Sequence, residues 1–114
     1  MVDAAPSQIS MEPMADGLRL AVQTRGAHGR PVLLFAHGFG QTRQAWAASA
    51  AALAARGCRC ASFDARGHGQ SERLPGGGYQ MEQFAYDLAQ IAGAQPEPPV
   101  LVGASMGGLL GLMV

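Results

Sequence analysis

A single serine stands among glycines near the end of the chain, in the stretch LVGASMGGL at residues 101–109. The centre of this stretch reads G-x-S-x-G, with apolar residues before and after it. A serine on a sharp turn between a buried strand and a helix, known as a nucleophile elbow, holds its hydroxyl above the sheet, where it can attack a carbonyl carbon. We expect such a turn to place Ser105 in a sparsely allowed backbone region with positive φ. The small residues Gly103, Gly107 and Gly108 would give the turn room, and the first amides of the helix favour developing negative charge. The pattern therefore indicates Ser105 as a nucleophile for acyl transfer, unless the glycines merely let a helix pack closely on a sheet.

The stretch FAHGFG at residues 35–40 follows an earlier apolar run. Acyl transfer needs two backbone N–H groups directed at the oxyanion, one from the residue after the nucleophile and one from a loop after an earlier strand. We expect Met106 and Phe39 to supply them, with Gly38 letting the second backbone turn inward. We expect the His37 ring to organise this loop by hydrogen bonding rather than to act as the catalytic base.

The stretch FDARGHGQS at residues 63–71 also carries side chains that could do chemistry. Asp64, Arg66 and His68 resemble parts of a catalytic triad, but the simpler expectation is that Asp64 and Arg66 pair and hold a glycine-rich loop. His28 lies in a glycine-flanked loop, where we expect no catalytic role. The C-x-C pair at residues 58–60 lies on one face of a strand, and we expect buried structural thiols and no metal site, because no further ligands are apparent.

The elements that must position these residues follow from hydrophobic patterning. Asp-Gly at residues 16–17 between two partly alternating runs predicts a hairpin, and Pro13 suits only an edge strand. Continuous apolar runs predict buried strands, and helical spacing or alanine-rich composition predicts helices between them. The expected strands cover 31–38, 58–64 and 100–104, and the expected helices cover 44–57, 79–94 and 106–114. This order predicts an α/β fold: a mostly parallel sheet with helices on both faces and an N-terminal β-hairpin.

Length and composition predict one globular domain over residues 1–114, with 48% hydrophobic and 14% charged residues. Eight basic residues balance eight acidic ones, so charge gives no reason to expect a nucleic-acid or anionic-membrane partner. The stretch at residues 1–10 lacks the basic cluster and apolar core of a signal peptide. The longest apolar run is shorter than the roughly 18 residues of a membrane span. We therefore expect a cytoplasmic protein.

The end of the sequence shapes a further expectation. Nine residues follow Ser105, none of them acidic or histidine, and the expected last helix carries no stop signal. We therefore expect a domain truncated at its C-terminus. The strand at residues 100–102 would then be an apolar edge through which the chain can associate with itself. We also expect exposed apolar side chains on the last helix, at Leu109, Leu110, Leu112 and Met113.

The segments HGFG, DARGHGQS and GASMGG, in this order, resemble the α/β-hydrolase superfamily in its N-terminal part, over residues 15–114. The resemblance implies a truncated α/β-hydrolase fold, Ser105 as nucleophile, Phe39 and Met106 as oxyanion donors, an ester or related acyl substrate and no cofactor. Serine rather than aspartate at this position argues against the epoxide-hydrolase and haloalkane-dehalogenase branches. It leaves open esterases, lipases, lactonases, thioesterases, carbon–carbon hydrolases, iminopeptidases and cofactor-free haloperoxidases. In this family the acid and the histidine follow the serine, so we expect these 114 residues to be inactive alone.

Two alternatives from other functional classes remain. In a nucleotide-binding domain, GFGQTR would begin a G-x-G-x-x-G motif, with Asp64 as the ribose-binding acid roughly 20 residues further on. Arg43 then occupies the third glycine position, where a small residue is needed, and GASMGGLL lacks the lysine of a phosphate-binding loop. The other alternative is a non-catalytic binding module or pseudoenzyme.

Overall fold

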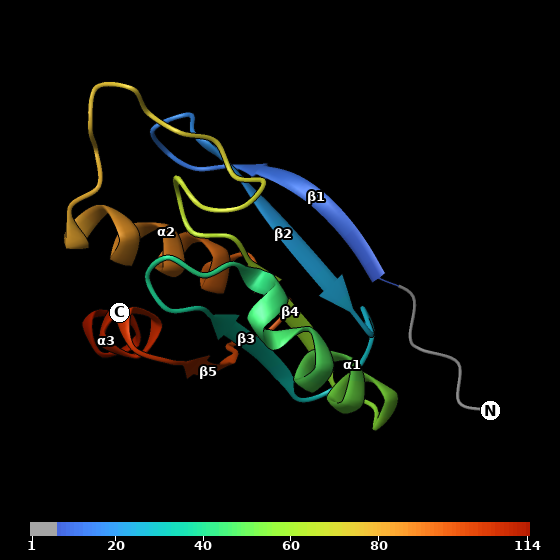
Figure 1. Cartoon of the computed structure of the whole chain (residues 1–114). Helices are drawn as coiled ribbons and strands as arrows, with labels where there is room; N and C mark the ends of the chain where they lie inside the picture. The colour runs from blue at the N-terminus through green and yellow to red at the C-terminus, as the bar shows by residue number, and fades with distance from the viewer. Residues whose placement is uncertain (1–6) are drawn as a thin grey trace.

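The computed structural model describes residues 7–114 (Figure 1). Its five strands form one sheet in the order β1-β2-β4-β3-β5. β3 runs parallel to β4 and β5, whereas β1 with β2 and β2 with β4 are antiparallel. The sheet is therefore mixed, with a parallel part of three strands, and the α/β class is confirmed. The strands are β1 Ser7–Pro13, β2 Arg19–Arg25, β3 Val32–Ala36, β4 Arg59–Phe63 and β5 Val100–Gly103.

The N-terminal hairpin pairs β1 with β2 from Ser7 opposite Arg25 to Pro13 opposite Arg19. Gly17 in its turn has φ 88°, the left-handed conformation that glycine adopts without steric cost. β1 is an edge strand, which suits Pro13 because proline has no N–H to donate to a neighbouring strand. The hairpin was predicted from Asp-Gly and is confirmed. Residues 1–6, part of the stretch assessed for a signal peptide, lie outside the described residues.

Helices cover both faces of the sheet, as predicted. A short 3-10 turn at Arg43–Trp46 leads into α1 (Ala47–Ala55), and α2 (Met81–Gly93) and α3 (Met106–Met113) follow later. Successive β3 side chains point to opposite faces, so Phe35 packs with the α1 side while Leu34 packs with the α2 and α3 side. Figure 1 shows α1 crossing in front of β3 and β4.

The parallel strands end level with one another. Ala36 at the end of β3 is paired with Phe63 at the end of β4 and with Gly103 at the end of β5. The loops that follow, at residues 37–42 and 64–80, and the turn into α3 therefore leave the sheet along one edge. This register brings the three segments singled out in the sequence to the same end of the molecule.

The C-terminal elements differ from expectation at one residue. β5 lies at the edge of the described sheet, with Val100 53% exposed, and Leu109, Leu112 and Met113 are exposed as expected. Leu110, however, is buried at 2%. It lies one helical turn after Met106, so both side chains face the sheet and join the core beneath α2 and α3.

The two thiols are free, with Cys60 buried and Cys58 half-buried. Burial raises the pKa of the Cys60 thiol to about 11, which keeps it protonated and unreactive. Within residues 7–114, no His, Cys, Asp and Glu side chains form a group of three or more that could hold a metal ion. No helix in the same range has both the length and the apolar character needed to cross a membrane.

Candidate active site

Ser105 has an unusual backbone conformation. Its dihedral angles are φ 55° and ψ −117°, and within residues 7–114 it is the one non-glycine residue with positive φ. Such a conformation costs on the order of 1–3 kcal/mol and persists only where the surrounding structure enforces it. The positive φ was predicted from the sequence and is confirmed. The side chain is exposed and makes no hydrogen bond to residues 7–114.

The close packing around Ser105 explains two of the three glycines. A Cβ on Gly103 would lie 2.5 Å from the carbonyl carbon of Gly107, and a Cβ on Gly107 would overlap the carbonyl oxygen of Ala36. A larger residue at Gly103 would push α3 away from the end of β5, and one at Gly107 would push it away from the end of β3. At Gly108 the nearest atom to an added Cβ is 3.6 Å away, an ordinary contact. The packing does not require a glycine at 108, contrary to the sequence expectation.

The loop after β3 lies beside Ser105. A Cβ added to Gly38 would be 3.3 Å from the Cβ of Ser105, so the absence of a side chain allows this approach. The amide of Gly38 donates to Oε1 of Gln41 at 3.2 Å. The amides of Phe39 and Met106, in contrast, donate to no acceptor within residues 7–114. Two free N–H groups therefore lie in the segments that flank the serine.

His37 organises this loop, as expected. Its ring is buried, its Nε2 accepts the Ala65 N–H at 2.9 Å, and its Nδ1–H donates to the Gly38 carbonyl at 2.7 Å. Burial lowers the pKa of His37 below its ordinary value, so the ring is neutral near pH 7. Because both ring nitrogens are engaged within the protein, neither is free to take a proton from Ser105.

The expected Asp64–Arg66 pair is wrong, because Asp64 pairs with Arg43. The Asp64 carboxylate accepts from the Arg43 backbone N–H at 2.7 Å and from its guanidinium, and both side chains are buried. It also accepts from the Gln70 N–H at 3.0 Å, and Ser71 Oγ donates to its backbone carbonyl at 2.6 Å. Asp64 therefore does hold the glycine-rich loop, but its charge is balanced by Arg43, the first residue of the 3-10 turn that follows the loop after β3.

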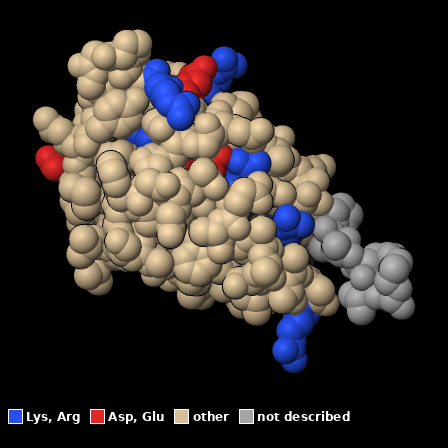
Figure 2. Space-filling model, in the orientation of Figure 1, with Lys and Arg blue, Asp and Glu red and all other residues tan. Residues whose placement is uncertain are grey.

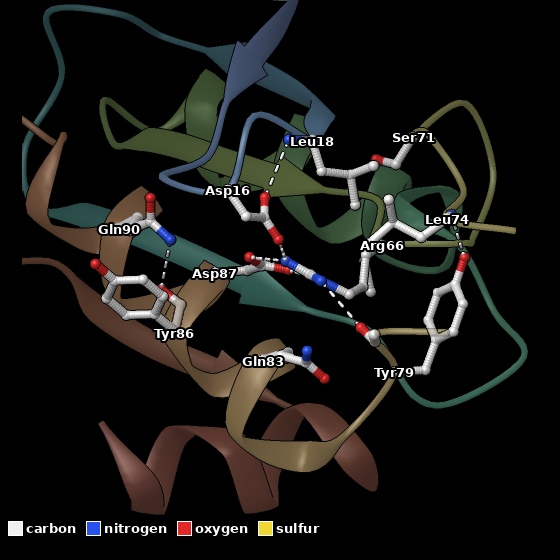
Figure 3. A network of polar contacts seen from close by, with 12 residues as sticks. Asp16, Leu18, Arg66, Ser71, Leu74, Tyr79, Gln83, Tyr86, Asp87 and Gln90 are labelled. Atoms are coloured by element: carbon white, nitrogen blue, oxygen red, sulfur yellow. Dashed lines mark hydrogen bonds and ion pairs between the residues drawn. The ribbon is translucent and has the colours of Figure 1, made fainter. Parts of the chain in front are cut away.

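Arg66 is the centre of a second ionic network (Figure 3). Its guanidinium donates to both oxygens of Asp87 on α2, at 2.6 and 2.8 Å, to Asp16 of the hairpin turn at 2.8 Å and to the Gly78 carbonyl at 2.9 Å. The bonds to Asp87 come first in holding the pKa of Arg66 above its usual range, so its charge is permanent. A hydrogen bond from the Leu18 N–H, with help from Arg66, lowers the pKa of Asp16.

Sequence reasoning missed Asp87, although the signal was present. Met81, Phe84, Leu88 and Ile91 define the apolar face of α2, and position 87 falls on that face. An acidic residue on a buried face needs a cationic partner, because an unpaired buried charge is costly. Burial indeed raises the pKa of Asp87, against the opposing effect of Arg66.

The two other histidines, His68 and His28, lie at opposite ends of the sheet. His68 is half-buried beside the loop after β3, and its Nε2 accepts the Gly40 N–H at 3.0 Å. A hollow of about 600 Å³ opens there, walled by the rings of Phe39, His68, Tyr79 and Phe84. His28 is exposed in a separate hollow with Gly57 and Cys58, which precede β4. It is therefore at the amino ends of the parallel strands, away from Ser105.

Figure 2 shows a face on which charged side chains are sparse and on which some basic and acidic side chains lie side by side. The charged side chains of Arg43, Asp64, Arg66 and Asp87, which hold the loops at this end of the sheet, are buried and paired. The site therefore combines an exposed hydroxyl, two free backbone amides and an aromatic hollow, held by buried ion pairs.

Comparisons with known proteins identify the family of this chain. Residues 31–114 match a family model described as alpha/beta hydrolase fold. Protein phosphatase methylesterase 1 of Mus musculus is 36% identical over 94 residues, which cover 78% of this chain and 24% of that protein. A thioesterase domain from the curacin biosynthetic pathway superimposes with TM-score 0.87 and 29% identity, covering 95% of this chain and 38% of that one.

An epoxide hydrolase from Vigna radiata, VrEH1, superimposes with TM-score 0.83 and 25% identity, covering 92% of this chain and 32% of that one. This chain thus spans about a quarter of the methylesterase, about two fifths of the thioesterase domain and about a third of the epoxide hydrolase.

Proposed function

Because this chain belongs to the alpha/beta hydrolase family, we propose that it supplies the nucleophile and the oxyanion hole of a serine hydrolase that cleaves an ester or related acyl bond. Ser105 would attack the carbonyl carbon, and the amides of Phe39 and Met106 would bind the oxygen as it becomes negative. Two observations support this proposal: the conformation of Ser105 and the free amides beside it.

The conformation of Ser105 carries the proposal. A positive φ at a non-glycine residue is strained, and glycine would adopt the same conformation without this strain. It does place an exposed hydroxyl at the amino end of α3, where the helix amides favour negative charge. A purely structural turn at this position would use glycine, as the chain does at Gly40 and Gly57.

The free amides support an oxyanion hole. The Met106 amide is one of the first N–H groups of α3, which have no partner inside the helix, and the Phe39 amide has no acceptor within residues 7–114, so both can donate to a ligand. The Met106 side chain packs in the core, which fixes the position of its backbone, and the loop bearing Phe39 is fixed by His37. Preorganised donors of this kind stabilise the tetrahedral intermediate without reorganising during the reaction.

The substrate class is proposed as an ester or thioester rather than an epoxide. Two of the similar proteins are named as a methylesterase and a thioesterase, whose names denote acyl transfer to water. The backbone of this chain also superimposes on that of an epoxide hydrolase. However, this chain has serine at position 105, and a serine in place of an aspartate there argues against the epoxide-hydrolase branch. The aromatic hollow beside Phe39 favours an apolar group on the substrate.

We further infer that the 114 residues alone turn over esters slowly. All three histidines precede Ser105 in the chain. His37 and His68 use both ring nitrogens in bonds within the protein, and His28 lies at the other end of the sheet. A positioned general base contributes typically 10²–10⁴-fold, and its absence leaves serine a weak nucleophile.

Chemical rescue of the missing base tests this function. The chain is incubated with p-nitrophenyl acetate, with and without imidazole, and acetylation of each serine is followed by mass spectrometry rather than by nitrophenol release, because imidazole itself hydrolyses the ester. We expect imidazole to accelerate acetylation of Ser105 by about tenfold or more, a part of what a positioned base provides. Ser105→Ala should lose the acetylated site.

The matched control is Ser49→Ala, which removes an exposed serine from α1 and should leave Ser105 acetylation unchanged. Equal acetylation of Ser49 and Ser105 would remove Ser105 from its role and favour a non-catalytic binding module. Fast turnover without imidazole would contradict the inference that these residues lack a base.

A further inference from the structure

His68 joins the two loops that border the candidate oxyanion hole. Its Nε2 accepts the Gly40 N–H at 3.0 Å, and its Nδ1–H donates to the Arg66 carbonyl at 2.9 Å. These two bonds require a neutral ring with its proton on Nδ1. His68 thereby connects the loop after β3 to the loop after β4 at the level of Phe39.

We propose that His68 is a positioning residue that holds the loop at residues 38–41 so that the Phe39 amide, and no other amide of the loop, faces the substrate. The proposal rests on the proposed function, because it assigns the Phe39 amide to the oxyanion.

The hydrogen bonds of three consecutive amides, at residues 38–40, show why the acceptor on His68 matters. The Gly38 N–H donates to the side chain of Gln41, and the Gly40 N–H donates to His68. The Phe39 N–H between them has no acceptor within residues 7–114. Two side chains thus occupy the flanking amides and leave the middle one free. Gly40 is exposed, so without His68 its amide would bond to water, and the loop could turn to present that amide in place of the Phe39 amide.

The conformation of the loop makes it sensitive to such a loss. Gly40 has φ 81°, and no atom lies within 4 Å of the position of its missing Cβ. A glycine at position 40 is therefore favoured by the positive φ and not by close packing. It also leaves the backbone at this position easy to rotate. A hydrogen bond to the Gly40 N–H is the direct means of stopping that rotation.

The ring of His68 adds a second restraint. It meets the ring of Phe39 edge to face, with 5.4 Å between centroids and 81° between planes, and lies 6.3 Å from Phe84 on α2. Such edge contacts favour a defined arrangement of aromatic rings. Phe39 is 73% exposed, so His68 is a principal contact that orients its side chain.

The anchor for His68 is itself rigid. The carbonyl it bonds belongs to Arg66, whose guanidinium is held by Asp87, Asp16 and the Gly78 carbonyl. The Arg66 side chain is buried at 2% exposure. The position of His68 is therefore set by α2 and the hairpin turn, and His68 transmits it to the loop bearing Phe39.

Two substitutions separate the acceptor from the ring. His68→Phe keeps an aromatic ring against Phe39 but removes the acceptor for Gly40. His68→Gln loses the ring but keeps an oxygen that can accept the Gly40 N–H. The control His28→Phe makes the same change at an exposed histidine at the other end of the sheet. Each variant of the 114-residue chain is studied by NMR of the ¹⁵N-labelled protein.

We expect the Nδ1–H tautomer of His68 in the unsubstituted chain and slow hydrogen exchange at the Gly40 amide. His68→Phe should accelerate that exchange roughly five- to tenfold, the factor expected for losing one typical hydrogen bond, and should shift the Phe39 amide resonance. His68→Gln should restore slow exchange, and His28→Phe should change neither signal. In the imidazole-assisted acetylation assay, His68→Phe should slow the reaction of Ser105 about tenfold or more without changing the ester concentration at half-maximal rate.

Unchanged Gly40 exchange in His68→Phe, or an Nε2–H tautomer in the unsubstituted chain, would overturn the proposal. Slow exchange of the Leu34 amide in β3 reports whether a variant is folded. If His68→Phe loses that protection, the tautomer and the His68→Gln variant decide the question. A chain in which Gly40 responds as expected but Ser105 is not acetylated refutes the proposed function and leaves the positioning of the loop by His68 intact.

Discussion

Replacing Ser105 by glycine should make the fold more stable than replacing it by alanine. The Ser105 backbone has φ 55° and ψ −117°, a conformation that costs a residue with a Cβ on the order of 1–3 kcal/mol. Alanine keeps that Cβ and its strain, whereas glycine has neither. Against this gain, glycine lowers the free energy of unfolding by roughly 0.5–1 kcal/mol, because its unfolded chain has more conformations to lose. We expect the glycine variant to exceed the alanine variant by about 0.5–2 kcal/mol, the difference of these two effects.

Urea unfolding followed by Trp46 fluorescence measures this difference. Trp46 is the one tryptophan of the chain, and its ring lies 5.2 Å from that of Phe35 in the core beneath α1. It therefore reports the loss of tertiary packing at low protein concentration, where association of the chain is weak. The unfolding free energy is obtained from the midpoint and the slope for each variant.

Ser49 supplies the matched pair. It is exposed in α1, where glycine is expected to be less stable than alanine by up to about 1 kcal/mol. The sign of the glycine-minus-alanine difference should therefore be opposite at the two serines. If glycine is the less stable residue at both positions, the elbow is not strained in solution, and the observation that carries the nucleophile assignment is lost.

Three further outcomes are expected. Burial lowers the pKa of His37 in the folded chain, whereas in the unfolded chain His37 binds a proton near its ordinary pKa of 6.5. The free energy of unfolding should therefore fall as the pH drops below about 6.5. In a profile of urea midpoints between pH 5 and 8, His37→Gln should flatten this part of the curve. Asp87→Asn should lower the free energy of unfolding by about 3–5 kcal/mol, because it leaves the buried Arg66 charge poorly balanced, and the double variant Arg66→Met/Asp87→Leu should cost less than the two single changes together. Sedimentation should show self-association of the chain, and Val100→Lys on the β5 edge should reduce it, since a lysine on an edge strand opposes strand pairing; a monomeric unsubstituted chain would contradict this interpretation.

The sequence predicted features that are encoded locally. Alternating and continuous apolar runs located the hairpin and the strands, and the spacing Gly-x-Ser-x-Gly predicted the positive φ of Ser105, because only a sharp turn satisfies that pattern between a strand and a helix. The role of His37 in its own loop was likewise predictable, since one of its two partners is the next residue.

The polar pairing around the site was not predictable in the same way. Arg43 and Asp64 are 21 residues apart, as are Arg66 and Asp87, and each pair forms because the fold brings together segments that are distant in the sequence. Asp64 and Arg66 are near neighbours in sequence, which suggested a pair, but they direct their side chains to different layers of the fold. The orientation of Leu110 also depends on how α3 meets the sheet, which the run of apolar residues in that helix does not specify.

The two buried ion pairs are best understood as devices that fix loops. A buried ion pair contributes little net stability, because the cost of removing two charges from water offsets their attraction. Each pair here joins the loop after β4 to another element: Arg43 with Asp64 joins it to the 3-10 turn that follows the loop after β3, and Arg66 with Asp87 joins it to α2. Apolar side chains could not replace them, since these loops expose many backbone groups that need hydrogen-bond partners, and Asp64 and Arg66 each bond the backbone as well as a side chain. The relative positions of Ser105 and the Phe39 amide therefore depend on polar contacts of defined geometry, which explains why charged residues are buried next to a site whose proposed chemistry uses none of them.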